Sequence, residues 1–197
     1  YVQPHLIKGQ NLSFKSSFHF YPSPAIYIND INYTDIKGTE LSIKNLKTFI
    51  DLSALIKSKM VLVKNLTLDS LRLRLVKKDF DELLKSVMFP LIREGLGVPR
   101  DPSNHLPKKF SMKNIILERT NGGDNAETFE IDSVEYATNK KQFMNVCFAS
   151  TEKVKAFHQQ FVAQYFVVIK VVDKCLVFTK SLKPLEIPKQ LLKQPIS

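Results

Sequence analysis

Apolar and polar residues alternate along much of the first half of the chain, but the alternation slips by one residue at recurring places. In "AIYINDINYT" (25–34), Ile26 and Ile28 alternate, the polar pair Asn29-Asp30 follows, and the pattern resumes out of phase at Ile31. Period-two alternation is typical of a strand with one buried face. In a plain strand the slip would send the later residues to the opposite face. One extra residue, as in a β-bulge, or a tight bend returns them to the first face.

The same arrangement (apolar-x-apolar, two polar residues, apolar-x-apolar) occurs in full around Asn29-Asp30, Asp69-Ser70, Lys113-Asn114 and Asp132-Ser133. A fifth copy carries the pair Lys44-Asn45 and ends on Thr48 instead of an apolar residue. We therefore predict repeated strand–bulge–strand units whose apolar positions share one face, either as a packed core or as an apolar groove. With the alternating strand that precedes them, the residues of this face are Leu12, Phe14, Phe18, Phe20, Ile26, Ile28, Ile31, Tyr33, Leu66, Leu68, Leu71, Leu73, Phe110, Met112, Ile115, Leu117, Phe129, Ile131, Val134 and Tyr136.

Helical spacing of apolar residues interrupts the strands at three places. The segment 79–97 opens with Asp79 and Glu82 in the spacing of a capping box. The segment 150–165 is amphipathic, and the stretch 49–59 has the spacing of one or two helical turns. These segments predict two or three helices.

Strand-like patterns return in the second half, at 110–118 and 128–137, and a hairpin is expected from 166–172 and 175–180. The fold class that follows is α+β and mainly β. We expect a curved, largely antiparallel twisted sheet with repeated strand–bulge–strand units and two to three helices packed on it.

The length of 197 residues fits one domain, 1–197, with a sizeable core. The segment 98–109 contains three prolines and is the best boundary if the chain divides further. The parts would then be 1–97, a sheet with a helix, and 110–197, a second sheet unit with the C-terminal helix and hairpin.

The formal net charge is +10, from 29 basic and 19 acidic residues. Such an excess favours anionic partners, whether phospholipid headgroups, nucleic acid or acidic proteins, and does not choose among them. The lysines are spread along the chain, which is typical of a solvated surface.

The longest apolar run, "FVVIKVV" (166–172), is too short to span a membrane and suits a buried strand. Because the chain begins at Tyr1, we expect a start codon, a cleaved signal peptide or a signal anchor upstream.

Two cysteines, Cys147 and Cys175, allow one internal pairing. Both fall in strand-like runs, where a buried free thiol is also common, so the sequence is compatible with a disulfide and with two free thiols.

Three glycosylation sequons begin at Asn11, Asn32 and Asn65. They would accept glycans in a secreted eukaryotic protein, and they also arise by chance in a chain rich in asparagine.

Two long segments resemble a known family through the order of their apolar patterns. The first is "GQNLSFKSSFHFYPSPAIYINDINYTDIKGTELSIKNLKTFIDLSALIKSKMVLVKNLTLDSLRLRL" (9–75), with its proline-led strand and its "LSIKNL" leading to "DLSALI". The second is "FSMKNIILERTNGGDNAETFEIDSVEY" (110–136), two strands around a glycine-containing turn. Together they resemble the N-terminal region of the AsmA family. From residue 144 onward the family pattern is not found.

The resemblance implies a periplasmic body of twisted β-sheet, held by an N-terminal anchor in the inner membrane of a Gram-negative bacterium. AsmA-like proteins are similar to the chorein-type proteins that guide phospholipids along an apolar groove. We therefore expect a role in phospholipid transport or in outer-membrane assembly and homeostasis. The expected partners are phospholipids or acyl chains, the inner membrane through an upstream anchor that this chain lacks, and envelope proteins. Nucleic acid is not expected as a partner.

The sequence carries no recognisable catalytic motif. The four histidines lie far apart and lack the spacing of a metal site, and no nucleophile elbow, phosphate loop or dinucleotide fingerprint occurs. Glu130 and Asp132 should share one face of a strand, an arrangement that a glycosidase pair would need, but we interpret them as residues of a solvated outer face. We expect a non-enzymatic protein without metal or cofactor. The alternative to a lipid-handling protein is a protein–protein interaction module of the envelope with a closed core and no lipid groove.

Overall fold

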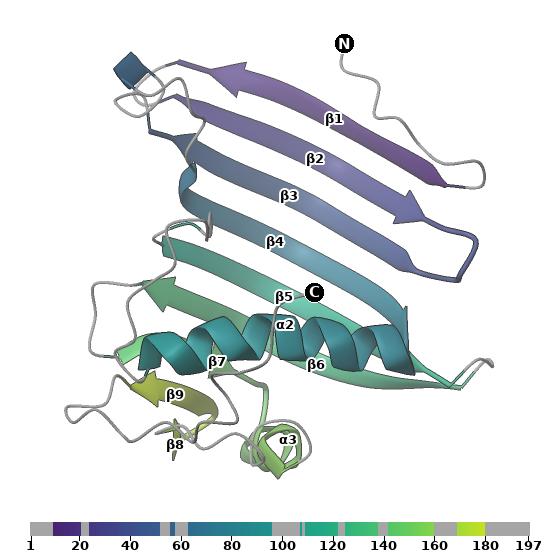
Figure 1. Cartoon of the computed structure of the whole chain (residues 1–197), viewed down its shortest axis with the longest axis vertical. Helices are drawn as coiled ribbons and strands as arrows, with labels where there is room; N and C mark the ends of the chain where they lie inside the picture. Colours follow the sequence, from purple (N-terminus) through teal and green to yellow (C-terminus); the bar gives the residue numbers. More distant parts are fainter. Residues whose placement is uncertain are drawn as a thin grey trace.

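Nine strands form one open sheet in the part of the chain that the structure, a computed structural model, describes (Figure 1). The described residues are 10–20, 24–51, 56–57, 63–95, 107, 109–121, 125–137, 142–159 and 169–179. The strands are β1 (Asn11–His19), β2 (Ala25–Thr34), β3 (Glu40–Ile50), β4 (Val63–Val76), β5 (Lys109–Thr120), β6 (Ala126–Ala137), β7 (Gln142–Cys147), β8 (Ile169–Val172) and β9 (Cys175–Thr179).

The strands follow the order β1-β2-β3-β4-β5-β6-β7-β9-β8 across the sheet. Every neighbouring pair is antiparallel except β4 and β5, which are parallel. Parallel neighbours need a crossover connection, and the helix α2 (Lys77–Gly95) lies in that connection. The predicted fold class, a mainly β, largely antiparallel curved sheet with helices on it, is confirmed.

Helix α2 begins directly after β4, two residues earlier than the pattern predicts. Asp79 therefore lies in its first turn, and the predicted capping box with Asp79 at the N-cap is wrong. An acidic side chain in the first turn still stabilises the helix through the positive end of its dipole. Phe80, one residue further on, is buried against the sheet.

The second helix, α3 (Thr151–Phe157), lies within the predicted segment 150–165. Ser150 is its N-cap, and the side-chain oxygen of Ser150 accepts a hydrogen bond from the backbone N–H of Lys153 at 3.3 Å. Val154 and Phe157 form its buried face. The predicted helix from 160 to 165 falls outside the described residues.

The helical spacing of 49–59 is only partly realised. Phe49 and Ile50 belong to β3, so the prediction is wrong for them: Phe49 pairs with Ala25 on one side and with Asn65 on the other. Strand pairing on both sides overrides the local helical pattern. Ile56 and Lys57 form a short helical turn, and the rest of this segment from 52 onward falls outside the described residues.

The slips in the sequence lie side by side in the sheet. In each of five adjacent strands, β2 to β6, one residue is skipped in the pairing while the residues on both sides of it stay in register. We call this line of skipped residues the crease: Asp30, Lys44, Ser70, Asn114 and Asp132.

Three residues of the crease adopt a left-handed backbone: Asp30 (φ 53°), Ser70 (φ 58°) and Asn114 (φ 53°). This conformation is uncommon for residues other than glycine, and Asp and Asn tolerate it best. The extra residue predicted from each slip is thus present. Because five adjacent strands all carry it, they stay in register through the crease, whereas the pairing of β1 with β2 shifts by one residue between Ser13 and Lys15.

The best-buried core lies between β4 and β9, under α2 and α3. Its buried members are Leu75, Phe80, Ile115, Ile131, Tyr136, Phe143, Met144, Val146, Phe148, Val154, Phe157, Leu176 and Phe178. A disulfide joins Cys147 of β7 to its partner Cys175 of β9, with the two Cα atoms 4.1 Å apart. The question of pairing that the sequence leaves open is therefore settled in favour of the bridge.

The turn between β2 and β3 is closed by Asp35. Its Oδ1 accepts hydrogen bonds from the backbone N–H groups of Thr39 and Lys37, both at 2.9 Å. The bond from Thr39, followed by that from Lys37, lowers the pKa of Asp35 against the opposing effect of desolvation.

This lowered pKa predicts a pH dependence. A carboxylate with a depressed pKa in the folded state stabilises the fold above its unfolded pKa of about 3.9, and the gain is lost as the pH falls through the folded pKa. We expect the wild type to exceed Asp35→Asn in denaturant midpoint at neutral pH. The difference should vanish in acid. A difference that is constant with pH would contradict this role for the charge.

Candidate functional site

The repeated apolar residues form transverse rows, each made of register partners on successive strands. Two rows lie on the side of the crease where β2 begins. The outermost consists of Phe18, Ile26, Thr48, Leu66, Phe110, Tyr136, Met144, Phe178 and Ile169. The next consists of Ser16, Ile28, Leu46, Leu68, Met112, Val134, Val146, Leu176 and Val171.

Two more rows lie on the other side of the crease. The nearer one consists of Ile31, Ile43, Leu71, Ile115 and Ile131. The further one consists of Leu12, Tyr33, Leu41, Leu73, Leu117 and Phe129. The four rows make up one apolar face, which continues on both sides of the crease.

All sixteen predicted residues of the four full copies fall in these rows, together with Leu12 and Phe18. Phe14 lies opposite the crease, where β1 changes register, and Phe20 follows the end of β1. The site prediction leaves out the residues that β7 and β9 add to the first two rows. These strands have only six and five residues, too short for a full repeat, although their alternation is the signal that could have found them.

The apolar face has a closed half, on β4 to β9. Phe80 and Leu84 of α2 pack there, and Val154 and Phe157 of α3 cover the edge near β6 and β9. The rings of Phe129 and Phe157 meet edge to face, with centroids 6.2 Å apart. In this half the rows form the protein core, except at β8, where Val171 is exposed.

The other half, on β1 to β3, is more open, and we call it the open half. No residue of these three strands belongs to the buried core cluster. Its apolar-face side chains are buried only at Ile43 and Thr48 of β3 and become more exposed towards β1, where Phe14 and Phe18 are each 45% exposed. Apolar surface is therefore accessible along the edge of the sheet.

Helix α2 also carries apolar side chains that do not pack on the sheet. Arg119 of β5 pairs with Asp81 of α2 at 3.5 Å, and its guanidinium carbon lies 5.8 Å from the ring centre of Phe80. With about 100° between successive helical residues, Leu83 and Val87 lie on the flank of α2 opposite Asp81. Both side chains are substantially exposed, so α2 presents apolar surface there.

The opposite face of the sheet is polar. Glu118 is buried there beneath the two arginines of β4: Arg72 donates to its Oε1 from Nε at 3.0 Å and from Nη2 at 2.6 Å, and Arg74 lies 4.0 Å from its Oε2. These arginines compensate the buried carboxylate. The network braces β4 against β5 on the face away from the apolar rows.

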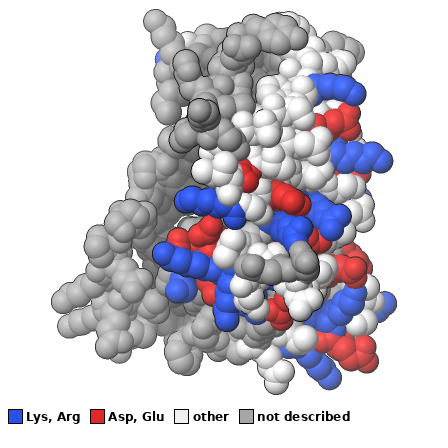
Figure 2. Space-filling view, turned by 90° about the vertical axis from the view of Figure 1, so that its right-hand side faces the viewer, with Lys and Arg blue, Asp and Glu red and all other residues white. Residues whose placement is uncertain are grey.

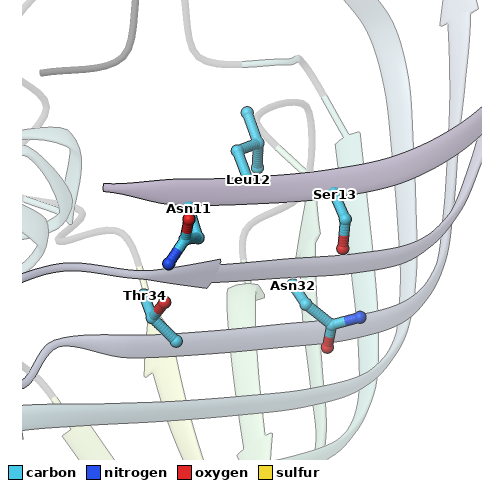
Figure 3. Close-up of a pocket in the computed structure, with 5 residues that line it drawn as sticks. All are labelled: Asn11, Leu12, Ser13, Asn32 and Thr34. Atoms are coloured by element: carbon cyan, nitrogen blue, oxygen red, sulfur yellow. The ribbon is translucent and has the colours of Figure 1, made fainter. Parts of the chain in front are cut away.

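Hollows of about 350 and 360 Å³ lie among the described residues, lined mainly from this polar face. In the first, Asn11, Ser13, Asn32 and Thr34 line the surface, and Leu12 points to the other side of β1 (Figure 3). The second is lined by Phe49, Asn65, Leu66, Thr67, Lys109, Ser111 and Glu135. Polar side chains contribute to both linings, beside apolar ones such as Leu12, Phe49 and Leu66.

Those titratable residues singled out in the sequence that the structure describes do not converge on one reaction centre, and His5 and His105 fall outside the described residues. Glu130 is exposed and accepts a hydrogen bond from Lys153, which lowers its pKa and so disfavours the protonated form that a general acid needs. Asp132 lies in the crease. His19 contacts Tyr27, with ring centres 4.8 Å apart. Within the described part of the chain, no group of three or more His, Cys, Asp or Glu side chains could hold a metal ion.

Charge is mixed on the side of the molecule where β2 ends and β3 begins. Figure 2 shows basic and acidic side chains interspersed there, and Arg74 pairs with Glu40 at 3.8 Å. This side offers no continuous basic surface for nucleic acid. None of the described helices has the length and apolar character that crossing a membrane requires.

Comparisons with protein-family models, with curated proteins and with solved structures find no match to this chain.

Proposed function

We propose that this chain is the periplasmic part of a non-enzymatic, membrane-tethered envelope protein of the AsmA type, and that it handles phospholipid through the open half of its apolar face. An inner-membrane anchor upstream would hold it at the periplasmic side. Its role would lie in phospholipid transport or in outer-membrane assembly and homeostasis.

One observation carries the proposal. Four in-register apolar rows run from a packed core into β3 and β2, and two of them continue to apolar residues of β1; apart from Ile43 and Thr48, their side chains there are only partly covered or exposed. A sheet that only had to pack on α2 and α3 would not need Ile31, Tyr33 and Leu41 to continue the rows beyond the helices. Partly exposed apolar surface of this kind typically marks a binding surface. Aliphatic and aromatic side chains of this kind are chemically suited to contact acyl chains.

The disulfide supports the proposed compartment. Bridges such as Cys147–Cys175 persist in oxidising environments, including the bacterial periplasm, and are rare in the cytosol of mesophiles. The proposal therefore predicts that the thiols of the native protein do not react with an alkylating reagent before reduction.

The proposal is tested by isolating the protein from membranes or periplasm without detergent and recording its native mass spectrum. We expect additional mass that corresponds to phospholipid and that disappears on extraction with organic solvent. Repeated absence of bound lipid, together with no binding of a fluorescent fatty acid, would refute lipid handling.

A second candidate is a protein–protein interaction module of the envelope, and the edge strand β1 favours it. In the described part of the chain β1 is the terminal strand of the sheet, and an edge strand with exposed Phe14 and Phe18 can pair with a strand of another protein. This function predicts a lipid-free protein and a stable complex that is lost when β1 is blocked by a proline at Ser16.

A further inference from the structure

A cluster of aromatic side chains gathers at the end of the sheet where β1 ends and β2 begins. The rings of Phe18 and Phe20 meet edge to face, with centroids 4.5 Å apart. On the opposite face, Lys47 places its ammonium 4.9 Å from the ring centre of Tyr27 and 4.7 Å from that of Phe49. Both faces of the sheet are therefore aromatic at this end.

Two of the most exposed apolar side chains of the described protein belong here. Phe20 is 77% exposed, and Ile56, in the helical turn between β3 and β4, is 78% exposed. Figure 1 shows this turn, in dark blue, at the same end of the sheet as the end of β1. We call Phe18, Phe20, Tyr27, Phe49 and Ile56 the aromatic corner.

The aromatic corner has a basic surround. Lys47, Lys57 and Lys64 lie on β3, on the helical turn and on β4 beside it. Between the crease and this end of β1 to β4, the acidic residues that the structure describes are Asp51 and, directly beside the crease, Asp69. Surfaces that bind anionic membranes typically combine exposed apolar side chains with nearby lysines.

The opposite end of the same strands also exposes an apolar side chain, but the charge around it differs. There the turn from β2 to β3 exposes Ile36 by 77%, next to Lys37, so an Ile-Lys pair projects from each end of the sheet. At the Ile36 end, Asp35 and Glu40 offset the basic charge. Only the aromatic corner combines its apolar tip with a net positive surround.

We propose that the aromatic corner docks this protein onto an anionic phospholipid bilayer. Phe20 and Ile56 enter the interfacial layer, Tyr27 lies at headgroup level, and Lys57 and Lys64 contact lipid phosphates. Aromatic rings with one polar end favour this depth of the bilayer, and lysines reach the phosphates along their aliphatic stems. Docking at this corner does not require that the open half carry lipid, although it would bring β1 and that half close to the membrane.

Co-sedimentation with vesicles tests the docking surface. Wild-type protein should bind vesicles of phosphatidylcholine mixed with phosphatidylglycerol, and bind more weakly to phosphatidylcholine alone or at high salt. The double variant Phe20→Ser/Ile56→Ser should bind about tenfold more weakly or worse, because two apolar side chains no longer enter the bilayer. The matched control, Ile36→Ser, should bind as the wild type does.

A second readout locates the contact without removing apolar groups. The chain contains no tryptophan, so a single introduced tryptophan reports its own surroundings. Fluorescence of Phe20→Trp should shift to the blue and be quenched by brominated lipid, whereas Ile36→Trp should show neither change. The proposal is overturned if wild-type protein does not bind anionic vesicles, if Ile36→Ser weakens binding as much as the double variant, or if both tryptophans respond alike. None of these results depends on the lipid content of the isolated protein, which tests the proposed function separately.

Discussion

Replacing both cysteines, as Cys147→Ala/Cys175→Ala, should lower the free energy of unfolding by about 3–4 kcal/mol. The bridge joins residues 28 apart and encloses α3 and β8, so its loss releases a long loop in the unfolded chain. Urea unfolding of the double variant and the wild type gives the difference.

Reduction of the wild type with dithiothreitol serves as the control, because it opens the same bridge without changing the sequence. Both treatments should lower the urea midpoint similarly. An unchanged midpoint in both would show that β7 and β9 are held by packing alone, with Leu176 and Phe178 sufficient to anchor the hairpin.

Deleting Ser70 from the crease should abolish cooperative folding. Without this residue, Leu71 and Leu73 would turn to the polar face, and Arg72 would point into the apolar rows. Moving large apolar side chains out of the interior costs about 2–5 kcal/mol each, and an unpaired buried arginine adds to the cost. The total is comparable with the whole stability of an ordinary domain.

The control for this deletion keeps the residue and removes only its side chain. Ser70→Gly should fold and should gain about 1 kcal/mol, because glycine adopts the left-handed conformation of this position without a steric cost. Circular dichroism and urea unfolding measure both variants. A deletion variant that unfolds as cooperatively as Ser70→Gly would show that the crease does not set the face of the later residues.

The alternation of apolar residues was enough to predict the strands and their shared face, because alternate residues of every strand point to the same face of the sheet. Ile31, Ile43 and Leu71 lie in one row since each comes directly after the crease in its own strand or, in β3, directly before it. Once five neighbouring strands share the same slip, only an in-register arrangement keeps all of their apolar side chains on one face.

Local sequence patterns could not predict that the apolar face divides into a closed and an open half. Leu41 and Leu73 look alike in sequence, but Leu73 packs against the core under α2 while Leu41 lies further towards the edge. The difference in packing between these two leucines depends on where the crossover helix α2 packs on the sheet, which is a property of the tertiary structure. Phe49 shows the same limit, because its pairing on both sides outweighs the helical spacing around it.

The aromatic corner was also hidden in the sequence. Phe20, Tyr27 and Ile56 belong to three separate segments, and only the register of β1, β2 and β3 brings those segments to one end. The net charge pointed to anionic partners without locating the contact. The location of the basic surface depends on where the acidic residues lie in the fold, for example at the turn that Asp35 closes.

The central claim, that the open half holds acyl chains, is tested most directly by titrating a fluorescent fatty acid into two neighbouring variants of β3. Leu41→Trp fills space over the apolar rows, whereas Ser42→Trp places the same side chain on the polar face. We expect wild type and Ser42→Trp to bind the fatty acid alike, and Leu41→Trp to bind about tenfold more weakly or worse. Absence of binding by the wild type, or equal binding by both variants, would contradict the account.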